Sequence, residues 1–144
     1  MARASAINGV VDAIHTVLDV AAYRALCPGG IYRGAAPSRV PPWTDLAGAA
    51  ETSWDTFGRL GSQVGVPVRV VTAGTHRDGD EQAATIIDKA LALLSDRSVL
   101  TVAGWTICAL TWAATEVGAE ELPDGTTQYV TTARLIVYLQ EAGV

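Results

Sequence analysis

The sequence is poor in the residues from which many catalytic and metal sites are built. It has two histidines and two cysteines in 144 residues. Cys27 and Cys108 are too few for a disulfide framework, and we expect both to be reduced thiols. A nucleophilic site would need Cys108 or a serine beside a histidine, and only His15 and His76 are available. The alternation around Cys108 instead predicts a buried, unreactive thiol.

Phosphate-binding motifs are also missing. There is no Gly-x4-Gly-Lys-Ser/Thr loop, and no Gly-x-Gly-x-x-Gly follows a predicted strand. One faint metal-binding pattern runs from His76 to Glu81, but it is far shorter than a twelve-residue calcium loop. We interpret its acids as the start of a helix, where the helix dipole favours negative charge. The sequence therefore predicts no cofactor, no metal and no catalytic residue.

Charge is scarce as well. Charged residues make up 17% of the chain, below the roughly 25% of an average soluble domain. The net charge of −5 argues against a surface that tracks nucleic-acid phosphates, because such surfaces are basic. No apolar run reaches the roughly 18 residues that span a bilayer, and the N-terminal stretch lacks a signal-peptide layout. We expect a protein made in a cytoplasm, with no membrane partner.

What the chain does have is enough apolar residues, 49%, to fill the core of one domain, which we place at residues 1–144. Apolar residues recurring at i, i+3 and i+4 from Ile7 to Ala21 predict one helix, which Pro28-Gly29-Gly30 ends, and a second helix is predicted over 79–95. Strands are predicted near 31–32 and over 43–52, 61–73, 105–117 and 127–139. Runs of strands after each helix predict an α+β fold, an antiparallel or mixed sheet with two α-helices packed on one face.

Two strand features bear on the surface. Pro67 lies inside the strand over 61–73, and because proline lacks an N–H, this strand should be an edge or be locally unpaired there. An edge strand can pair with a neighbouring subunit. Trp105 and Trp112 differ by an odd number of residues, which predicts that they point to opposite faces of their strand. One of them would then need cover from outside the core.

The most informative segment is Ser53–Arg59, where Trp54 and Phe57 lie in a predicted loop. Burying one aromatic side chain stabilises a protein by roughly 2–3 kcal/mol, which a solvated loop would forgo. The loop should therefore fold back onto its own core or be covered by another subunit. Tryptophan is a common interface anchor. The residues that we expect at an interface are Trp54, Asp55, Thr56, Phe57, Arg59, Trp43 and Pro67.

The order of these elements resembles the tail terminator, or tail-completion, family of long-tailed bacteriophages and related prophage elements. The likeness runs from about residue 7 to 140. It is carried by the opening helix and Cys27–Pro37, the strand start Pro42-Trp43, Glu51–Arg59, the valine strand 64–71, the helix over 79–95 and a closing hairpin. Thr44, Asp45 and Pro67 depart from the family pattern, in which the first two positions are apolar and the strand of Pro67 alternates cleanly.

This resemblance implies a structural virion protein without enzymatic activity that assembles as a homo-hexameric ring. Such a ring caps the tail tube, stops its polymerisation and gives the DNA-filled head a docking surface. The implied partners are other copies of the chain, the tail tube protein and a head-completion or connector protein. The implied location is the head–tail junction of the virion, where DNA can pass through the ring without sequence-specific contacts. By analogy, the aromatic loop contacts a sister subunit or the tail tube.

Three other interpretations stay open. The protein can be a neighbouring head–tail connector ring, which sequence separates poorly from a terminator. It can be a dimeric α+β module with a small ligand between the first helix and the sheet, which would need a deep apolar pocket with converging polar groups. It can also be a hydrolase that uses Cys108 and His76, in which case Cys108→Ala would remove the activity and keep the fold.

Overall fold

The computed structural model describes residues 5–34, 41–55, 60–73, 76–121, 123, 125 and 127–142, with the side chains of 76–80 and 114 left aside. The predicted interface residues Thr56, Phe57 and Arg59 lie outside the described residues. The described elements are α1 (Ile7–Leu18), α2 (Ala21–Leu26), β1 (Ile31–Tyr32), β2 (Trp43–Asp45), β3 (Ala50–Ser53), β4 (Gly61–Ala73), α3 (His76–Leu93), the 3-10 helix η1 (Arg97–Val99), β5 (Trp105–Glu121) and β6 (Thr127–Glu141).

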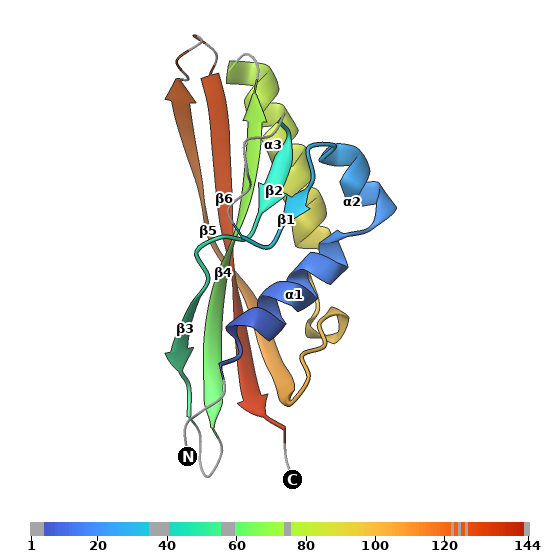
Figure 1. Cartoon of the computed structure of the whole chain (residues 1–144), viewed down its shortest axis with the longest axis vertical. Helices are drawn as coiled ribbons and strands as arrows, with labels where there is room; N and C mark the ends of the chain where they lie inside the picture. Colours follow the sequence, from blue (N-terminus) through green and yellow to red (C-terminus); the bar gives the residue numbers. More distant parts are fainter. Residues whose placement is uncertain are drawn as a thin grey trace.

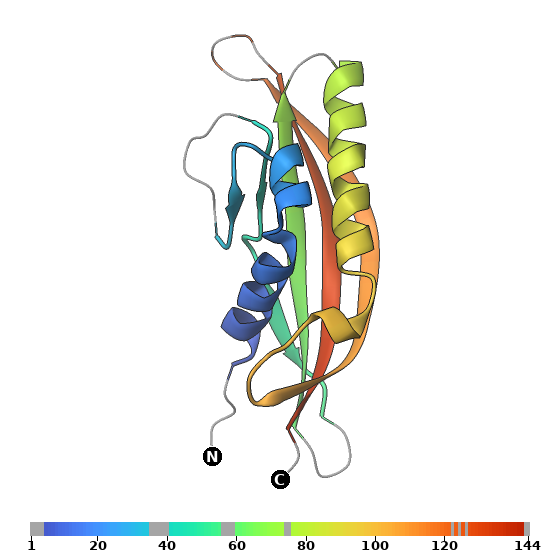
Figure 2. The ribbon, with the colours of Figure 1, turned by 90° about the vertical axis from the view of Figure 1, so that its right-hand side faces the viewer.

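The six strands form one sheet in the order β1-β2-β4-β6-β5, and β3 pairs with β4 on the same side as β2. Only β1 and β2 run parallel among the described pairs, so the sheet is mixed. The three α-helices cover one face of the sheet, as two views at right angles show (Figures 1 and 2). The predicted α+β class is confirmed, and the third helix arises because the first predicted helix is broken.

The core lies between the helices and one face of the long strands. Alternate residues of β4 and β6 face the helices, as the period of a strand requires. The predicted alternations over 61–73 and 127–139 are therefore confirmed. The buried residues of these two strands and of α1 and α3 include Val64, Val66, Val68, Val70, Leu135, Val137, Leu139, Val10, Ile14, Leu18, Ile86, Ala90 and Leu94.

The first predicted helix, expected to be continuous up to Pro28-Gly29-Gly30, ends at Leu18 instead. Val20 is extended (φ −119°, ψ 155°), and α2 starts directly after it. The Arg24 guanidinium bridges the break by binding the Asp19 carboxylate at 2.8 Å, and this hydrogen bond lowers the pKa of Asp19. The break changes the chain direction, so that a residue off the apolar stripe of α1 can reach the sheet.

That residue is Tyr23, which is fully buried. Its hydroxyl oxygen lies 2.8 Å from Thr44 Oγ1, and the Cys27 sulfur lies 3.2 Å from the same atom. These contacts explain why strand position 44 holds a polar residue inside the core. Burial raises the pKa of the Tyr23 phenol and of the Cys27 thiol, so both groups stay protonated near neutral pH.

The prediction that the strand over 61–73 is an edge is wrong, but the alternative, a local gap at Pro67, is confirmed. On one side β4 pairs with β6 along its whole length. On the other side β3 pairs with residues 62–65 and β2 with residues 69–71, which leaves 66–68 without a strand partner. The Gly61 carbonyl accepts a bond from the β3 side, so odd positions of β4, Pro67 included, turn their backbone towards this gap.

The gap also explains why the strand predicted over 43–52 is divided into β2 and β3. The loop 46–49 runs past the backbone that Pro67 leaves unpaired. Gly48 has a φ of 91°, a conformation that favours glycine, and a Cβ placed there would lie 3.5 Å from Pro67 Cγ. The missing N–H of one residue thus interrupts the neighbouring strand.

The prediction that Trp105 and Trp112 point to opposite faces is also wrong. The register of β5 against β6 shifts between Ile107 and Ala109, so one extra residue enters the strand. Such a bulge reverses the side-chain parity. Trp105 and Trp112 therefore both pack against the core, and Trp112 Nε1 donates to the Leu94 carbonyl at 3.3 Å. Cys108, predicted to be buried, lies at this bulge and is half-buried.

Candidate assembly surfaces

The side of the sheet that faces away from the helices, here called the outer face, holds Trp43 and Pro67, two of the residues that were predicted at an interface. Its members follow from register, because residues paired across neighbouring strands share a face. Trp43 pairs with Val71, Val71 with Val130, and Gln63 with Tyr138. The apolar members on β2, β4 and β6 are Trp43, Pro67, Val71, Val130, Ile136 and Tyr138.

Trp54 folds back onto this face. Its indole meets the Tyr138 ring edge-on, with centroids 5.3 Å apart and planes at 65°. Its backbone N–H donates to the Gly61 carbonyl at 3.0 Å, which extends the β3–β4 pairing by one residue. Trp54 is nevertheless only half-buried. Part of its ring is covered by its own chain and part remains available for contact.

Asp55 has a local role. Its carboxylate accepts the Gly61 N–H at 3.0 Å, although the residue itself is exposed. A Cβ on Gly61 would overlap the Trp54 carbonyl oxygen, so only glycine fits between these two residues. Asp55 and Gly61 thus fix the two ends of the segment whose middle lies outside the described residues.

Trp43 lies at the other end of the outer face and is 8% exposed. Its Nε1 donates to Asp45 Oδ2 at 3.4 Å, and the same oxygen lies 3.6 Å from an Arg69 nitrogen. Asp45 is 1% exposed, and a buried polar side chain needs such partners to offset its lost contact with water. Arg69 Nε is buried without a hydrogen-bond partner among the described residues.

The structure places these residues on one face but does not gather them into one cluster. Trp43 pairs with Val71, whereas Trp54 lies beside Gly61, ten residues earlier in β4. At roughly 3.3 Å per residue this separation is about 30 Å. Pro67 lies between them and is buried. The predicted residues therefore mark the two ends and the middle of an extended surface.

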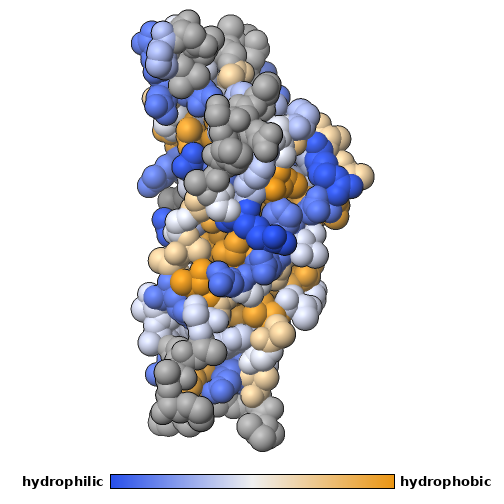
Figure 3. All heavy atoms as spheres, in the orientation of Figure 1, coloured by the Kyte–Doolittle hydropathy of each residue, from blue (hydrophilic) through white to orange (hydrophobic). Residues whose placement is uncertain are grey.

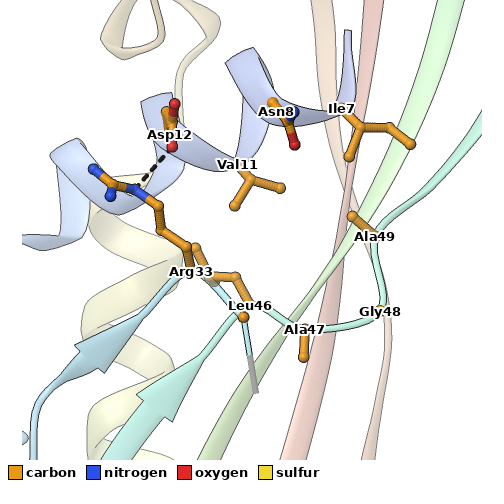
Figure 4. A pocket seen from close by; sticks show the side chains of 10 residues that line it. Ile7, Asn8, Val11, Asp12, Arg33, Leu46, Ala47, Gly48 and Ala49 are labelled. Carbon is orange, nitrogen blue, oxygen red and sulfur yellow. Dashed lines mark ion pairs between the residues drawn. The ribbon is translucent and has the colours of Figure 1, made fainter. Parts of the chain in front are cut away.

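A shallow groove between α1 and the loop 46–49 occupies about 510 Å³ (Figure 4). In the space-filling view, apolar residues gather on this side of the molecule, between hydrophilic ones (Figure 3). The charged groups on the groove, Arg33 and Asp12, bind each other at 2.8 Å and are more than half exposed. Paired and solvated charges offer little to a ligand, unlike the deep pocket with converging polar groups that a small-ligand module would need.

A second groove of about 460 Å³ lies between α3 and the far half of β5. Ala84, Ile87 and Leu91 of α3 line it together with Val117 of β5. Val117 is 63% exposed although it points to the helix side of the sheet. The strand β5 has β6 on one side and no other strand partner among the described residues, so its outer edge is open.

Within the described residues, no group of three histidine, cysteine or acidic side chains could hold a metal ion. The pattern from His76 to Glu81 opens α3, as expected, but the side chains of 76–80 are outside the description. Among the helices described, none is long and apolar enough to cross a membrane.

Sequence reasoning missed the even positions of β6, where Val130, Ile136 and Tyr138 support the outer face. The signal was present, because Val130, Thr132, Arg134, Ile136 and Tyr138 are more apolar than the solvated face of an antiparallel strand usually is. The odd positions of β6 alone form a complete core face, so they do not reveal the second apolar series.

No protein-family model and no curated protein matches the sequence. Among solved structures, a chain from the "Virion of native gene transfer agent (GTA) particle" is similar to this protein. The two chains share 16% identity and superpose with a TM-score of 0.67, over 94% of this chain and 99% of that chain. At this identity the similarity shows a shared fold.

Proposed function

We propose that this chain is a structural protein of a phage-type virion, which forms a homo-hexameric ring that caps the tail tube, ends tail polymerisation and offers a docking surface to the head. The observation that carries the proposal is the whole-chain fold similarity to a chain of a gene transfer agent particle. That similarity covers almost the whole of both chains, so it concerns the complete domain and not a shared subdomain. The proposal assigns the protein no catalytic role.

The form of the molecule supports a role in assembly. Among the strands that the structure describes, β5 lies at an open edge, and the outer face carries half-buried aromatic residues such as Trp54 and Tyr138. Exposed sheet edges and apolar surfaces are liabilities that a protein in an assembly can cover. A ring needs two different surfaces on each subunit, because it forms by head-to-tail contacts.

The contacts belong to the same proposal. The residues proposed at the interface with a sister subunit or the tail tube are Trp54, Asp55, Thr56, Phe57, Arg59, Trp43 and Pro67. Because Trp43 and Pro67 are buried within one chain, their part is to shape the outer face. Trp54 has ring surface left for a partner. The partners are the tail tube protein and a head-completion or connector protein, at the head–tail junction of a virion assembled in the host cytoplasm.

Deleting the gene in a particle-producing cell and imaging the particles tests the role directly. A terminator predicts overlong tails, whereas tails of normal length beside unjoined heads would assign the chain to a connector ring. Normal particles in normal number would refute both roles. Complementation with the wild-type chain is the control for effects on neighbouring genes.

A further inference from the structure

The C-terminal half of β5 is bare on both faces and has β6 as its only strand neighbour among the described residues. Every residue from Thr115 to Glu121 is exposed, including Val117, whose side chain points to the helix side of the sheet. The N-terminal half of β5, in contrast, packs on the core through Trp105 and Trp112. A strand that is exposed on both faces and along one edge is open to pairing with another chain.

Alternate backbone groups in this half of β5 point to its free edge. The Gly61 carbonyl of β4 accepts a bond from the β3 side, so even positions of β4 bond to odd positions of β6. Even positions of β6 therefore bond to β5, and the β5 residues between those pairs, Thr115, Val117 and Ala119, turn their N–H and C=O groups away from the sheet. The register is unbroken over Thr115–Glu121, so these groups are evenly spaced for a further strand.

Two other stretches of free edge are closed by side chains. In the N-terminal half of β5, Arg97 Nη1 donates to the Cys108 carbonyl at 3.0 Å. On β1, at the opposite side of the sheet from β5 (Figure 2), the Ile31 carbonyl accepts a bond from His15 Nε2 at 3.0 Å. Residues 115–121 receive no such side-chain bond within the part of the chain that the structure describes. The backbone of this stretch is therefore available to a partner.

The charges around the free edge are mostly acidic. Between residues 98 and 133 the chain has no lysine, arginine or histidine. Glu116 and Glu120 point to the outer face, and Asp88 is the charged residue on the groove between α3 and β5. Arg134 on β6 lies diagonal to Glu116, but no ion pair joins the two side chains in the described structure. A strand added here would meet carboxylates on the outer face and apolar side chains of the groove on the helix side.

We propose that Thr115–Glu121 binds an extended, basic segment of a different protein, which adds to the sheet as a strand beside β5. Successive residues of a strand face opposite sides, so lysine or arginine side chains would meet Glu116 and Glu120 while small apolar side chains would lie beside Val117. The main-chain hydrogen bonds supply affinity, and the side chains select the partner. That this partner is another protein of the particle rests on the proposed function.

The charges argue against a second copy as the occupant. Pairing two β5 strands would bring Glu116 and Glu120 close to the same acids of the other copy, and like charges on neighbouring strands are destabilising. The strand β3 contains Glu51 and no basic residue. The strand β1 is two residues long, and its Ile31 carbonyl is already bonded to His15. Among the strands that are described, none offers a free edge with basic side chains.

The test is amide hydrogen exchange of the full chain, followed by NMR, with a synthetic peptide of about nine residues that alternates lysine and valine. With saturating peptide, exchange at Val117 and Ala119 should slow by about tenfold, because these N–H groups gain partners. Exchange at Gly118, which is already bonded to β6, should change less. A peptide that alternates glutamate and valine should leave exchange unchanged. Equal slowing by the two peptides, or no slowing by the basic one, would overturn the proposal.

Substitutions on the edge separate backbone pairing from charge. Val117→Pro removes an N–H that β6 does not use, so the chain should fold while binding of the basic peptide weakens by about tenfold or more. Val117→Thr keeps the N–H and is the matched control, with wild-type affinity. The double variant Glu116→Lys with Glu120→Lys keeps every backbone group and should also bind about tenfold more weakly. Circular dichroism verifies folding, and wild-type affinity in either the proline or the double variant would contradict an added basic strand.

Particles made with the same variants distinguish this proposal from the proposed function, which deletion of the gene tests by itself. A deletion strain complemented with Val117→Pro or with the double variant should form fewer complete particles than one complemented with Val117→Thr. Full complementation by both would overturn the strand contact and leave the proposed function intact. Self-association of the wild-type chain that Val117→Pro abolishes would assign the edge to a second copy, and would overturn the proposal as well.

Discussion

Replacing Trp54 by alanine separates the two roles that this residue can have. Half-burial removes about 100 Å² of the side chain from water, which is worth about 2.5 kcal/mol at roughly 25 cal/mol per Å². The edge-on contact with Tyr138 adds about 1 kcal/mol. These figures are upper values, because the unfolded chain is itself partly compact. We expect Trp54→Ala to lower the free energy of unfolding by about 2–3 kcal/mol, below the 3–5 kcal/mol typical of fully buried aromatic residues.

The assay is urea unfolding followed by far-ultraviolet circular dichroism, at a concentration where the chain is monomeric, so that association does not add to stability. A double-mutant cycle with Tyr138→Ala should give a coupling of about 1 kcal/mol. A loss below about 1 kcal/mol with no coupling would refute the packing of Trp54 on its own sheet. Weakened assembly of the Trp54→Ala variant would then indicate that the indole of Trp54 contacts a partner subunit.

Three further outcomes follow from single contacts. Glu51 accepts the Ser62 hydroxyl and, at 3.1 Å, the Ala6 N–H beside α1, so Glu51→Ala should lower the free energy of unfolding by about 2 kcal/mol and speed amide exchange at the start of α1. Gly61→Ala should lower the melting temperature sharply, because the added Cβ meets the Trp54 carbonyl. The control Gly65→Ala should be tolerated, because its Cβ would lie 3.5 Å from the Arg134 side chain. Equal effects of the two substitutions would contradict this geometry. Burial raises the pKa of the Cys27 thiol. Near pH 8 a thiol reagent should therefore modify half-buried Cys108 first and reach Cys27 only on unfolding. Rapid labelling of both thiols in the folded protein would exclude the burial of Cys27.

Local sequence patterns predicted the fold class. The predictions that failed concerned single residues whose effects depend on distant parts of the chain. The valine alternation and the odd positions of β6 predicted the core faces correctly, because side-chain direction in a strand depends only on residue parity. Residue parity gave the wrong relative direction for Trp105 and Trp112, because a β-bulge lies between them and a bulge is a property of the pairing of two strands. Pro67 was a correct signal of a missing hydrogen bond, but only the neighbours of β4 show on which side it is missing.

The candidate surfaces could be anticipated only in part. Trp54 and Trp43 stood out because large aromatic residues in short or irregular segments need cover. The support that Tyr138 gives to Trp54 joins residues 84 positions apart, and no local pattern connects them. The same holds for the contact between Asp45 and Arg69, which explains why position 45 of β2 tolerates an acidic residue.

By itself the sequence determined the elements and their apolar faces, because helix and strand periods are fixed by backbone geometry over a few residues. It also determined that the chain has few groups able to do chemistry, since composition needs no structure. The tertiary structure decided which strands are neighbours, and therefore that among the described strands β4 is internal and β5 lies at the edge. It also decided that Trp54 packs on Tyr138 and that Asp45 meets Arg69, because such contacts depend on distances that only the folded chain sets.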